Sequence, residues 1–210
     1  MGQVESAPSA MPSTRDGLIL LVCALLVGVA SWVPVRGRQV PGWEEAVFRA
    51  VNDLPGLLYG PVWVVMQLGT WFAIAGVALV ALVLRRTRLA LAFALAGVTA
   101  SLLSNVFKAV VGRGRPAALL ADVHTRGLVP TGNGYPSGHA SVAFALATVA
   151  WLCLDGWVRW VLPCAAVIVG FARIYVGAHL PVDVVGGAAL GTACGVAVSL
   201  ALRPRPSVAG

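Results

Sequence analysis

The 210-residue chain has little charge of either sign, because Lys, Arg, Asp and Glu make up only 11% of it while hydrophobic residues make up 59%. Soluble domains carry about 25% charged residues, so this composition excludes an ordinary soluble protein and indicates a membrane protein. Lysine occurs only at Lys108, and histidine occurs only at His124, His139 and His179. Polar residues this rare in an apolar chain are candidate functional residues.

Cysteine is also scarce, and its spacing excludes the usual metal-binding patterns. Cys23, Cys153, Cys164 and Cys194 all lie in apolar stretches. We expect them to be buried thiols that act as small hydrophobic side chains, and neither zinc ligands nor disulfides. The net charge of +7 would suggest nucleic acid in a soluble protein. Here the basic residues are spread over several loops, so we expect anionic lipid head groups and an anionic substrate as partners, and no nucleic acid.

Six apolar runs are long enough to cross about 30 Å of hydrocarbon. They cover residues 17–33, 61–84, 89–107, 139–154, 157–172 and 183–202. We therefore predict an all-α fold, a polytopic six-transmembrane-helix bundle over residues 17–203, with a disordered tail at 1–16 and a short tail at 204–210. A re-entrant hairpin is the alternative for the fourth and fifth runs, because the break at Asp155-Gly156 is tight.

The side of the membrane follows from the span count and the positive charges. Six spans place both termini on one side and the loops 34–60, 108–138 and 173–182 on the other. Arg85, Arg86 and Arg88 form the strongest basic cluster between two spans, and they share the side of the termini. The positive-inside rule then predicts a multi-pass protein of the cytoplasmic membrane with cytoplasmic termini and three outward-facing loops.

Three short clusters of strongly polar residues lie in the second half of the chain. The clusters are Lys108 with Arg115-Pro116, then Pro136-Ser137-Gly138-His139, then Arg173 with His179 and Asp183. Lys108, Arg115 and Arg173 are donor-only cations, which would repel one another unless an anion with several acceptor oxygens lay between them. Phosphate has this geometry. Ser137 precedes an apolar run, so we expect it to be the N-cap of a helix whose first N–H groups point to the anion, and Gly138 leaves room for the approach.

The two histidines of these clusters can supply the two roles that phosphomonoester cleavage needs. His179 can attack phosphorus, with Asp183 hydrogen-bonded to its other ring nitrogen, and His139 can protonate the departing oxygen. Pro181 fits best in the first turn of a helix, which leaves His179 near the helix entrance.

The three clusters and their internal spacing resemble the signature of the type 2 phosphatidic acid phosphatases. These are integral-membrane lipid phosphate phosphatases related to vanadium haloperoxidases, and the resemblance covers residues 60–200. It implies phosphate binding by Lys108, Arg115, Ser137, Gly138 and Arg173. It also implies a phosphohistidine on His179 oriented by Asp183, with His139 as the acid, and no metal or other cofactor. The family commonly places serine before the arginine of the third cluster, where this chain has Ala172, so fine positioning there is in doubt.

The sequence thus predicts metal-independent dephosphorylation of a membrane lipid phosphate or polyprenyl (di)phosphate at the outer membrane face. A lipid phosphotransferase would use the same phosphohistidine with an acceptor other than water. A non-catalytic lipid-binding or transport protein would not need both histidines. The motifs do not distinguish phosphatidate, phosphatidylglycerol phosphate, a polyprenyl diphosphate and a polyprenyl-linked sugar phosphate.

Several features outside the clusters have two interpretations. Trp43–Asn52 has helical apolar spacing, and we expect an interfacial connector, with a lid over the site as the alternative. Gly187, Gly191 and Gly195 favour close packing inside the bundle, with a homodimer through the last span as the alternative. Four remaining loop residues are expected to be solvated or to contact head groups: Arg113, Asp122, His124 and Arg126. For Arg113 and Arg126, the alternative is that they hold a second phosphate.

Overall fold

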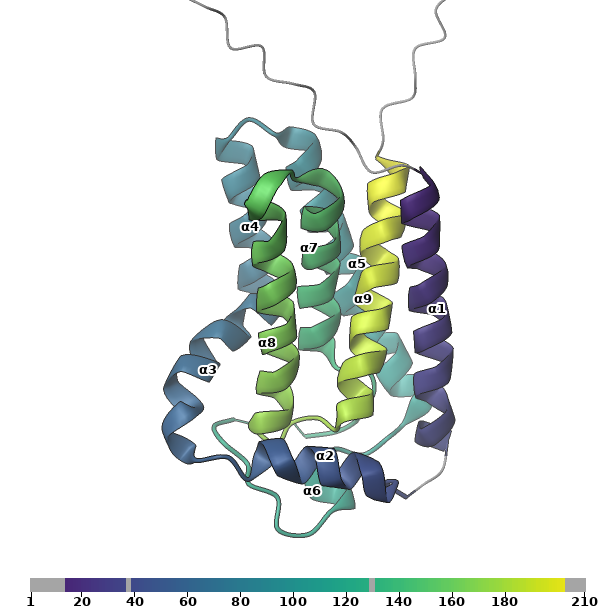
Figure 1. Ribbon diagram of the computed structural model, residues 1–210, viewed down its shortest axis with the longest axis vertical. Coiled ribbons are helices and arrows are strands. Elements are labelled where there is room, and N and C mark those ends of the chain that lie inside the picture. Colours follow the sequence, from purple (N-terminus) through teal and green to yellow (C-terminus); the bar gives the residue numbers. More distant parts are fainter. Residues whose placement is uncertain (1–13, 37–38, 129–130, 203–210) are drawn as a thin grey trace, which may run out of the picture.

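The computed structural model describes residues 14–36, 39–128 and 131–202. Every regular element within these residues is helical (Figure 1). The elements in chain order are α1 (Thr14–Arg36), α2 (Gly42–Asn52), η1 (Gly56–Leu58), α3 (Tyr59–Met66), η2 (Gln67–Gly69), α4 (Trp71–Val83), α5 (Thr87–Val111), α6 (Pro116–Leu119), α7 (Gly138–Cys153), η3 (Gly156–Trp160), α8 (Val161–Tyr175) and α9 (Pro181–Ala201). The all-α prediction is confirmed. The predicted tails lie outside the described residues, except that residues 14–16 begin α1.

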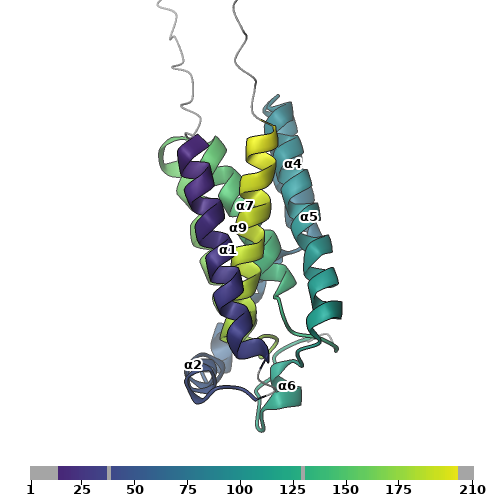
Figure 2. The same ribbon diagram turned by 90° about the vertical axis from the view of Figure 1, so that its right-hand side faces the viewer.

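The helices α1, α4, α5, α7, α8 and α9 run alongside one another in a bundle (Figures 1 and 2). Three segments of the described chain are long and apolar enough to span a membrane: Thr87–Leu119, Gly156–Tyr175 and Pro181–Ala201. A bent pair over 56–83 would make a fourth, and Gly17–Trp32 and Gly138–Cys153 are shorter apolar helices. The architecture is that of a helical membrane protein, and the count of six spans stays a prediction.

The predicted second span, 61–84, is not a continuous helix. The segments Gly56–Gly69 and Trp71–Val83 meet at a bend of 65°. The chain adopts an extended conformation at Thr70, and Gly69 packs so closely on α7 that a Cβ there would lie 2.7 Å from the carbonyl oxygen of His139. Only glycine permits this approach. The break therefore brings the η2 turn against the first turn of α7.

The last helix packs on α7 through its glycine face. A Cβ on Gly187 would lie 2.5 Å from the carbonyl oxygen of Ser137, and one on Gly195 would lie 2.7 Å from the Cβ of Thr148. Gly191 abuts the backbone of Ser141 and Ala145 in the same way. The expected packing within the bundle is confirmed. The alternative of a homodimer through the last span is not supported by the glycines, because α7 covers their face.

The expectation of buried thiols holds only for Cys194. All four cysteines lie in described residues and none forms a disulfide, but Cys23 and Cys164 are exposed and Cys153 is half-buried. The outward face of a membrane helix is as apolar as its inward face, so an apolar run does not show which way a cysteine points.

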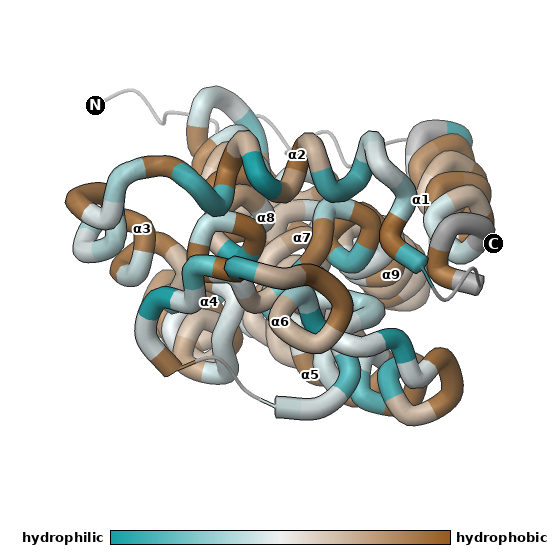
Figure 3. Tube along the Cα trace, turned by 90° about the horizontal axis from the view of Figure 1, so that it is seen from below, coloured by the Kyte–Doolittle hydropathy of each residue, from teal (hydrophilic) through white to brown (hydrophobic). Residues whose placement is uncertain are grey.

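The two ends of the bundle differ. α1 begins and α9 ends at one end, where a Cβ on Gly17 would lie 3.1 Å from Leu200 (Figure 1). The loops that carry the polar clusters lie at the opposite end, where α2 and α6 lie across the bundle (Figure 3). The three clusters therefore share one end, as the span count predicted. The compartment that this end faces stays a prediction.

Replacing Gly191 with valine should separate α7 from α9, because the new side chain would meet backbone atoms that cannot move aside. Overpacking of this kind costs about 1–3 kcal/mol. Each kcal/mol lowers the melting temperature of a chain of this size by about 2–4 °C. Thermal unfolding in detergent, followed by tryptophan fluorescence, measures the shift. Gly76→Val is the matched control, since a Cβ there meets nothing within 4 Å. Equal melting temperatures for the two variants would contradict the packing.

Candidate active site

The predicted site residues come together at the end of the bundle that α2 crosses. The Nη1 atom of Arg115 lies 3.4 Å from Nε2 of His179 and donates a hydrogen bond of 2.9 Å to the carbonyl of Ala178. His139 lies close enough to four charged or titratable side chains to interact with them electrostatically: Arg173, His179, Lys108 and Arg115. Three segments far apart in sequence thus form one site: the end of α5 with its loop, the start of α7, and the α8–α9 turn.

The end of α5 presents the first cluster. Gly112 adopts a left-handed conformation, φ 67°, and its N–H bonds the carbonyl of Lys108 at 3.1 Å, which ends the helix. The side chain of Asn133 donates to the same carbonyl at 2.8 Å. Arg115 is the N-cap of α6 and Pro116 follows at the first helical position. The turn at Gly112 therefore directs Arg115 back toward the α8–α9 turn.

Ser137 occupies the N-cap position of α7, as predicted, but its hydroxyl makes no capping bond. The Ser137 N–H instead donates to the carbonyl of Asp183 at 2.8 Å, which joins α7 to α9. A Cβ on Gly138 would lie 3.2 Å from both Nζ of Lys108 and Oγ of Ser104. The absence of a side chain at Gly138 therefore leaves room beside the lysine. Ser104 belongs to no sequence motif and was not predicted as a site residue.

The α8–α9 turn places the third cluster. The carbonyl of Arg173 accepts the N–H groups of Ala178 at 3.1 Å and His179 at 3.2 Å, and Gly177 adopts φ 74°. A Cβ on Gly177 would lie 2.7 Å from the carbonyl oxygen of His124, so the turn requires glycine for both conformation and space. α9 then starts with Leu180 as N-cap and Pro181 at its first position. His179 lies just before the helix, as Pro181 predicted.

Four buried polar atoms at this site have no hydrogen-bond partner among the described residues. They are Nε of Arg115, Oγ of Ser137, Nε of Arg173 and Nδ1 of His179. Arg173 is 4% exposed, and the partner of its Nη1 is the weakly accepting sulfur of Met66 at 2.9 Å. Buried donors without acceptors are costly. The arrangement is suited to an anion that offers several acceptor oxygens.

The carboxylate of Asp183 lies beside His179 but does not bond it. Its Oδ2 is 3.7 Å from Nδ1 of His179, beyond hydrogen-bond distance. The same Oδ2 accepts the N–H of Leu180 at 2.9 Å, and Oδ1 accepts Nη1 of Arg113 at 2.9 Å. The predicted hydrogen bond between Asp183 and His179 is therefore not formed in this structure, because Asp183 also caps α9 and binds an arginine.

Burial lowers the pKa of His179 well below its ordinary value, and the charges of Arg173, Arg115 and Lys108 lower it further. The backbone of Gly134 opposes this shift. The ring is therefore neutral at physiological pH. A neutral imidazole with a proton on Nδ1 keeps a lone pair on Nε2, the nitrogen that faces Arg115.

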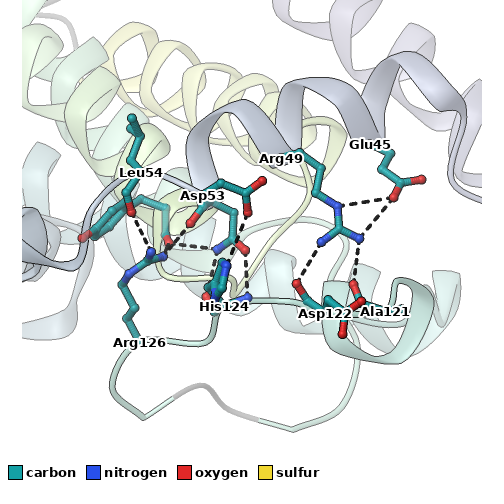
Figure 4. Close-up of polar contacts among 10 residues, drawn as sticks. Glu45, Arg49, Asp53, Leu54, Ala121, Asp122, His124 and Arg126 are labelled. Atoms are coloured by element: carbon teal, nitrogen blue, oxygen red, sulfur yellow. Dashed lines mark hydrogen bonds and ion pairs between the residues drawn. The ribbon is translucent and has the colours of Figure 1, made fainter.

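Arg113 and Arg126 are not solvated loop charges, and neither is available for a second phosphate. Arg113 is buried and binds both oxygens of Glu44, at 3.1 and 2.6 Å, as well as Asp183. Arg126 donates to the carbonyls of Asn52, Leu54 and Tyr175, and its guanidinium lies 4.3 Å from the centre of the Tyr175 ring (Figure 4). Both expectations for these arginines are wrong, because each side chain satisfies buried acceptors of the protein itself.

The predicted helix at 43–52 is present as α2, but it is more than an interfacial connector. Its Arg49 donates to the carbonyls of Ala121 and Asp122, and its Asn52 exchanges two bonds of 2.9 Å with the backbone of His124 (Figure 4). The helix is thus bonded to the loop that follows α6. The ring of His124 itself is mostly exposed and lies 3.7 Å from Asp53.

Glu44 of α2 was not predicted as a site residue, yet it is fully buried. The predicted apolar face comprised positions 43, 47, 48 and 51. The residues of α2 that are buried are Glu44, Phe48 and Asn52, which repeat at every fourth position. The signal in the sequence was its spacing, because Glu44 lies four residues before Phe48, an apolar residue of the predicted face.

Comparison with known proteins identifies the family. A model of the PAP2 superfamily matches residues 87–206. The chain belongs to the PAP2 superfamily. The match includes all three polar clusters, so the resemblance inferred from their spacing is confirmed.

Two curated relatives are similar to most of this chain. One is an undecaprenyl-diphosphatase of Sulfolobus acidocaldarius, 29% identical over 83% of this chain and 85% of its own length. The other is the bacitracin transport permease protein BcrC of Bacillus licheniformis, 32% identical over 69% of this chain and 73% of its own length.

Two solved PAP2-like structures share the fold. LpxE of Aquifex aeolicus superposes with a TM-score of 0.63 at 28% identity, covering 74% of this chain and 93% of its own. A PAP2-type phosphatidylglycerolphosphate phosphatase of Bacillus subtilis superposes with a TM-score of 0.68 at 22% identity, covering 88% of this chain and 94% of its own. The second match shows the fold alone.

Titration of the histidine rings tests the electrostatics of the site. The neutral form of His179 should predominate at pH 6.5, the ordinary pKa, and be lost only as pH falls through the lowered pKa. Added orthophosphate should raise this pKa, because an anion between the cations offsets their charge. Nitrogen NMR of histidine-labelled protein in detergent measures both, with His124→Ala and His139→Ala variants for assignment. A half-protonated His179 at or above pH 6.5 in phosphate-free protein would contradict the site.

Proposed function

We propose that this chain is a PAP2-type phosphatase that dephosphorylates a membrane lipid phosphate or a polyprenyl diphosphate through a phosphohistidine on His179. The observation that carries the proposal is the gathering of unbalanced positive charge around a neutral imidazole. Within the described residues, Lys108, Arg115 and Arg173 form no ion pair with a carboxylate. Their positive charge is therefore available to bind a phosphate.

The first step transfers the phosphoryl group to the enzyme. Nε2 of His179 attacks phosphorus, the bond from phosphorus to the lipid oxygen breaks, and a phosphorus–nitrogen bond forms. His139, protonated once the bound phosphate offsets the charge of the surrounding cations, gives its proton to the departing lipid oxygen. The cations, the Ser137 hydroxyl and the first N–H groups of α7 stabilise the charge on the three phosphoryl oxygens. Because these groups neutralise the phosphate, the step requires no metal ion.

The second step returns the enzyme to its starting state. His139, now neutral, takes a proton from water, whose oxygen attacks phosphorus and breaks the phosphorus–nitrogen bond. Inorganic phosphate leaves. General acid–base catalysis of this kind contributes about 10²- to 10⁴-fold to a rate.

An apolar groove on the side of the bundle supports the proposal that the substrate is a lipid. It has a volume of about 260 Å³ and lies between α1, α5 and α9. Its lining includes Gly28, Trp32, Phe107 and Ala189, and at the site end Tyr135 and Pro136, the residues that precede Ser137. The hydrocarbon chain of the substrate lies in this groove while the head group enters the polar site. The undecaprenyl-diphosphatase among the relatives favours a polyprenyl diphosphate as the first compound to assay.

The site faces outward across the cytoplasmic membrane in this proposal. Arg85 and Arg86 lie in the α4–α5 connection and Arg88 lies in the first turn of α5, at the end of the bundle opposite the site (Figure 1). A positive loop of this kind favours the cytoplasmic side. The polyprenyl phosphate product would then be released at the outer leaflet.

Phosphoenzyme trapping tests the mechanism. Labelled substrate should give an acid-labile, alkali-stable phosphoenzyme in the wild type and none in His179→Ala. His139→Ala should still be phosphorylated by p-nitrophenyl phosphate, whose leaving group needs no proton, but should turn over about 10²- to 10⁴-fold more slowly. Phosphoenzyme in His179→Ala would overturn the assignment. Phosphate release that requires an added lipid alcohol would identify a phosphotransferase instead.

Filling the groove tests where the lipid chain lies. In Gly28→Leu the new side chain would enter the groove, since a Cβ there lies 3.7 Å from Ala189 and no closer to other atoms. The kcat/KM for a long-chain polyprenyl diphosphate should fall about tenfold because the chain is misplaced. The kcat/KM for p-nitrophenyl phosphate should be unchanged. Gly76→Leu, at an open position on α4, is the control. Equal values for both variants, or equal losses with both substrates, would contradict the groove.

A further inference from the structure

A second charged cluster lies behind the phosphate site and contains no residue of the family signature except Asp183. Arg113 donates from Nη1 to Oδ1 of Asp183 at 2.9 Å and to Oε1 of Glu44 at 3.1 Å, and from Nη2 to Oε2 of Glu44 at 2.6 Å. The side chains of Arg113, Glu44 and Asp183 are 6%, 0% and 0% exposed. Because its donors are occupied by carboxylates, Arg113 is not a phosphate-binding residue.

Glu44 also holds the first turn of α9 directly. Its Oε1 accepts the N–H of Val182 at 3.0 Å. Helix-start N–H groups have no partner within their own helix, so this bond satisfies one of them. Leu180, at the N-cap, donates to Oδ2 of Asp183. Asp183 is therefore fixed from three sides: through Arg113, through its own capping bond, and through the bond from Val182 to Glu44.

The charges of this cluster do not balance. One guanidinium is shared by two carboxylates, so the cluster of Glu44, Arg113 and Asp183 carries an excess negative charge. The nearest functional group is Nδ1 of His179, 3.7 Å from Oδ2 of Asp183. If Glu44 were neutral, the guanidinium would be balanced by Asp183 alone and little of the carboxylate charge would act on the histidine.

We propose that Glu44 is a positioning residue for His179. Through Arg113 it fixes the carboxylate of Asp183 and leaves that carboxylate with the negative charge that stabilises the positive ring formed when Nε2 of His179 accepts the phosphoryl group. Glu44 contacts neither substrate nor reacting atoms. The inference rests on the proposed phosphohistidine mechanism, and it assigns to α2 a role in catalysis.

Glu44→Gln tests the proposal, because it keeps the shape of the side chain and removes its charge. Carboxylates that orient a histidine on a metal are typically worth about 10- to 100-fold, and we expect a fall of that size in the rate constant of phosphoenzyme formation. The KM should change by less than about twofold, since Lys108, Arg115 and Arg173 are untouched. Glu45→Gln is the matched control: Glu45 is the next residue of α2, is 40% exposed and pairs only with Arg49, at 3.2 Å. It should match the wild type.

Rapid quenching separates catalysis from folding. The amplitude of the phosphoenzyme burst counts folded sites, while its rate constant measures the chemistry of each site. A purely structural Glu44 would lower the amplitude and leave the rate constant unchanged, which would overturn the proposal. Absence of phosphoenzyme in the wild type would instead refute the proposed function.

Two further variants keep the test decisive if Glu44→Gln fails to fold. Glu44→Asp retains the charge on a shorter side chain, so its rate constant should lie closer to the wild type than that of any folded neutral variant. Arg113→Lys retains the charge but loses the two-pronged donor geometry, so its rate constant should fall. A wild-type rate constant in Arg113→Lys would overturn the proposal, as would equal rate constants in the Asp and Gln variants of Glu44.

Discussion

The unbalanced positive charge at one end of an apolar bundle is the constraint on which the site depends. Lys108 and Arg115 converge there from the end of α5 and its loop and Arg173 from the end of α8, and no carboxylate of the described residues pairs with them. Such an arrangement is unfavourable until an anion binds. The packing of α7 against α9 through glycines holds the segments in place despite the repulsion. The proposed phosphate site therefore depends on the tight packing of these helices.

The site separates its charges into two layers. The inner layer is cationic, and its charges add to the effect of burial in lowering the pKa of His179, so that the ring is neutral, as the proposed nucleophile must be. The outer layer contains the carboxylates of Asp183 and Glu44 around Arg113 and is anionic overall. In the proposed intermediate, the phosphoryl group on Nε2 of His179 faces the first layer and the proton on Nδ1 faces the second. The negative phosphoryl group thus faces the cationic layer, and the positive ring faces the anionic layer.

The sequence predicted the parts of this protein that depend on residue type and short spacing. The helical fold, the three clusters and the position of His179 before Pro181 follow from apolar run lengths, motif gaps and the fixed φ of proline. The bend at Gly69 was not predictable, because it depends on contact with His139 some seventy positions away. The burial of Arg113 depends likewise on Glu44, a residue of another helix. Long-range partners of charged residues are set by tertiary packing, which composition does not encode.

α2 illustrates this limit most clearly. Its amphipathic pattern correctly predicted a helix, but an interfacial helix and a helix over a polar site have the same apolar periodicity. The position of its carboxylate distinguishes the two cases. A helix lying only on lipid head groups would leave Glu44 in water, whereas here Glu44 is fully buried and bonded to Arg113 and to the N–H of Val182. Burying a carboxylate is costly unless it is paired. Glu44, Arg113 and the first turn of α9 must therefore assemble together, and Asp183 acquires its final arrangement only when α2 lies across the end of the bundle.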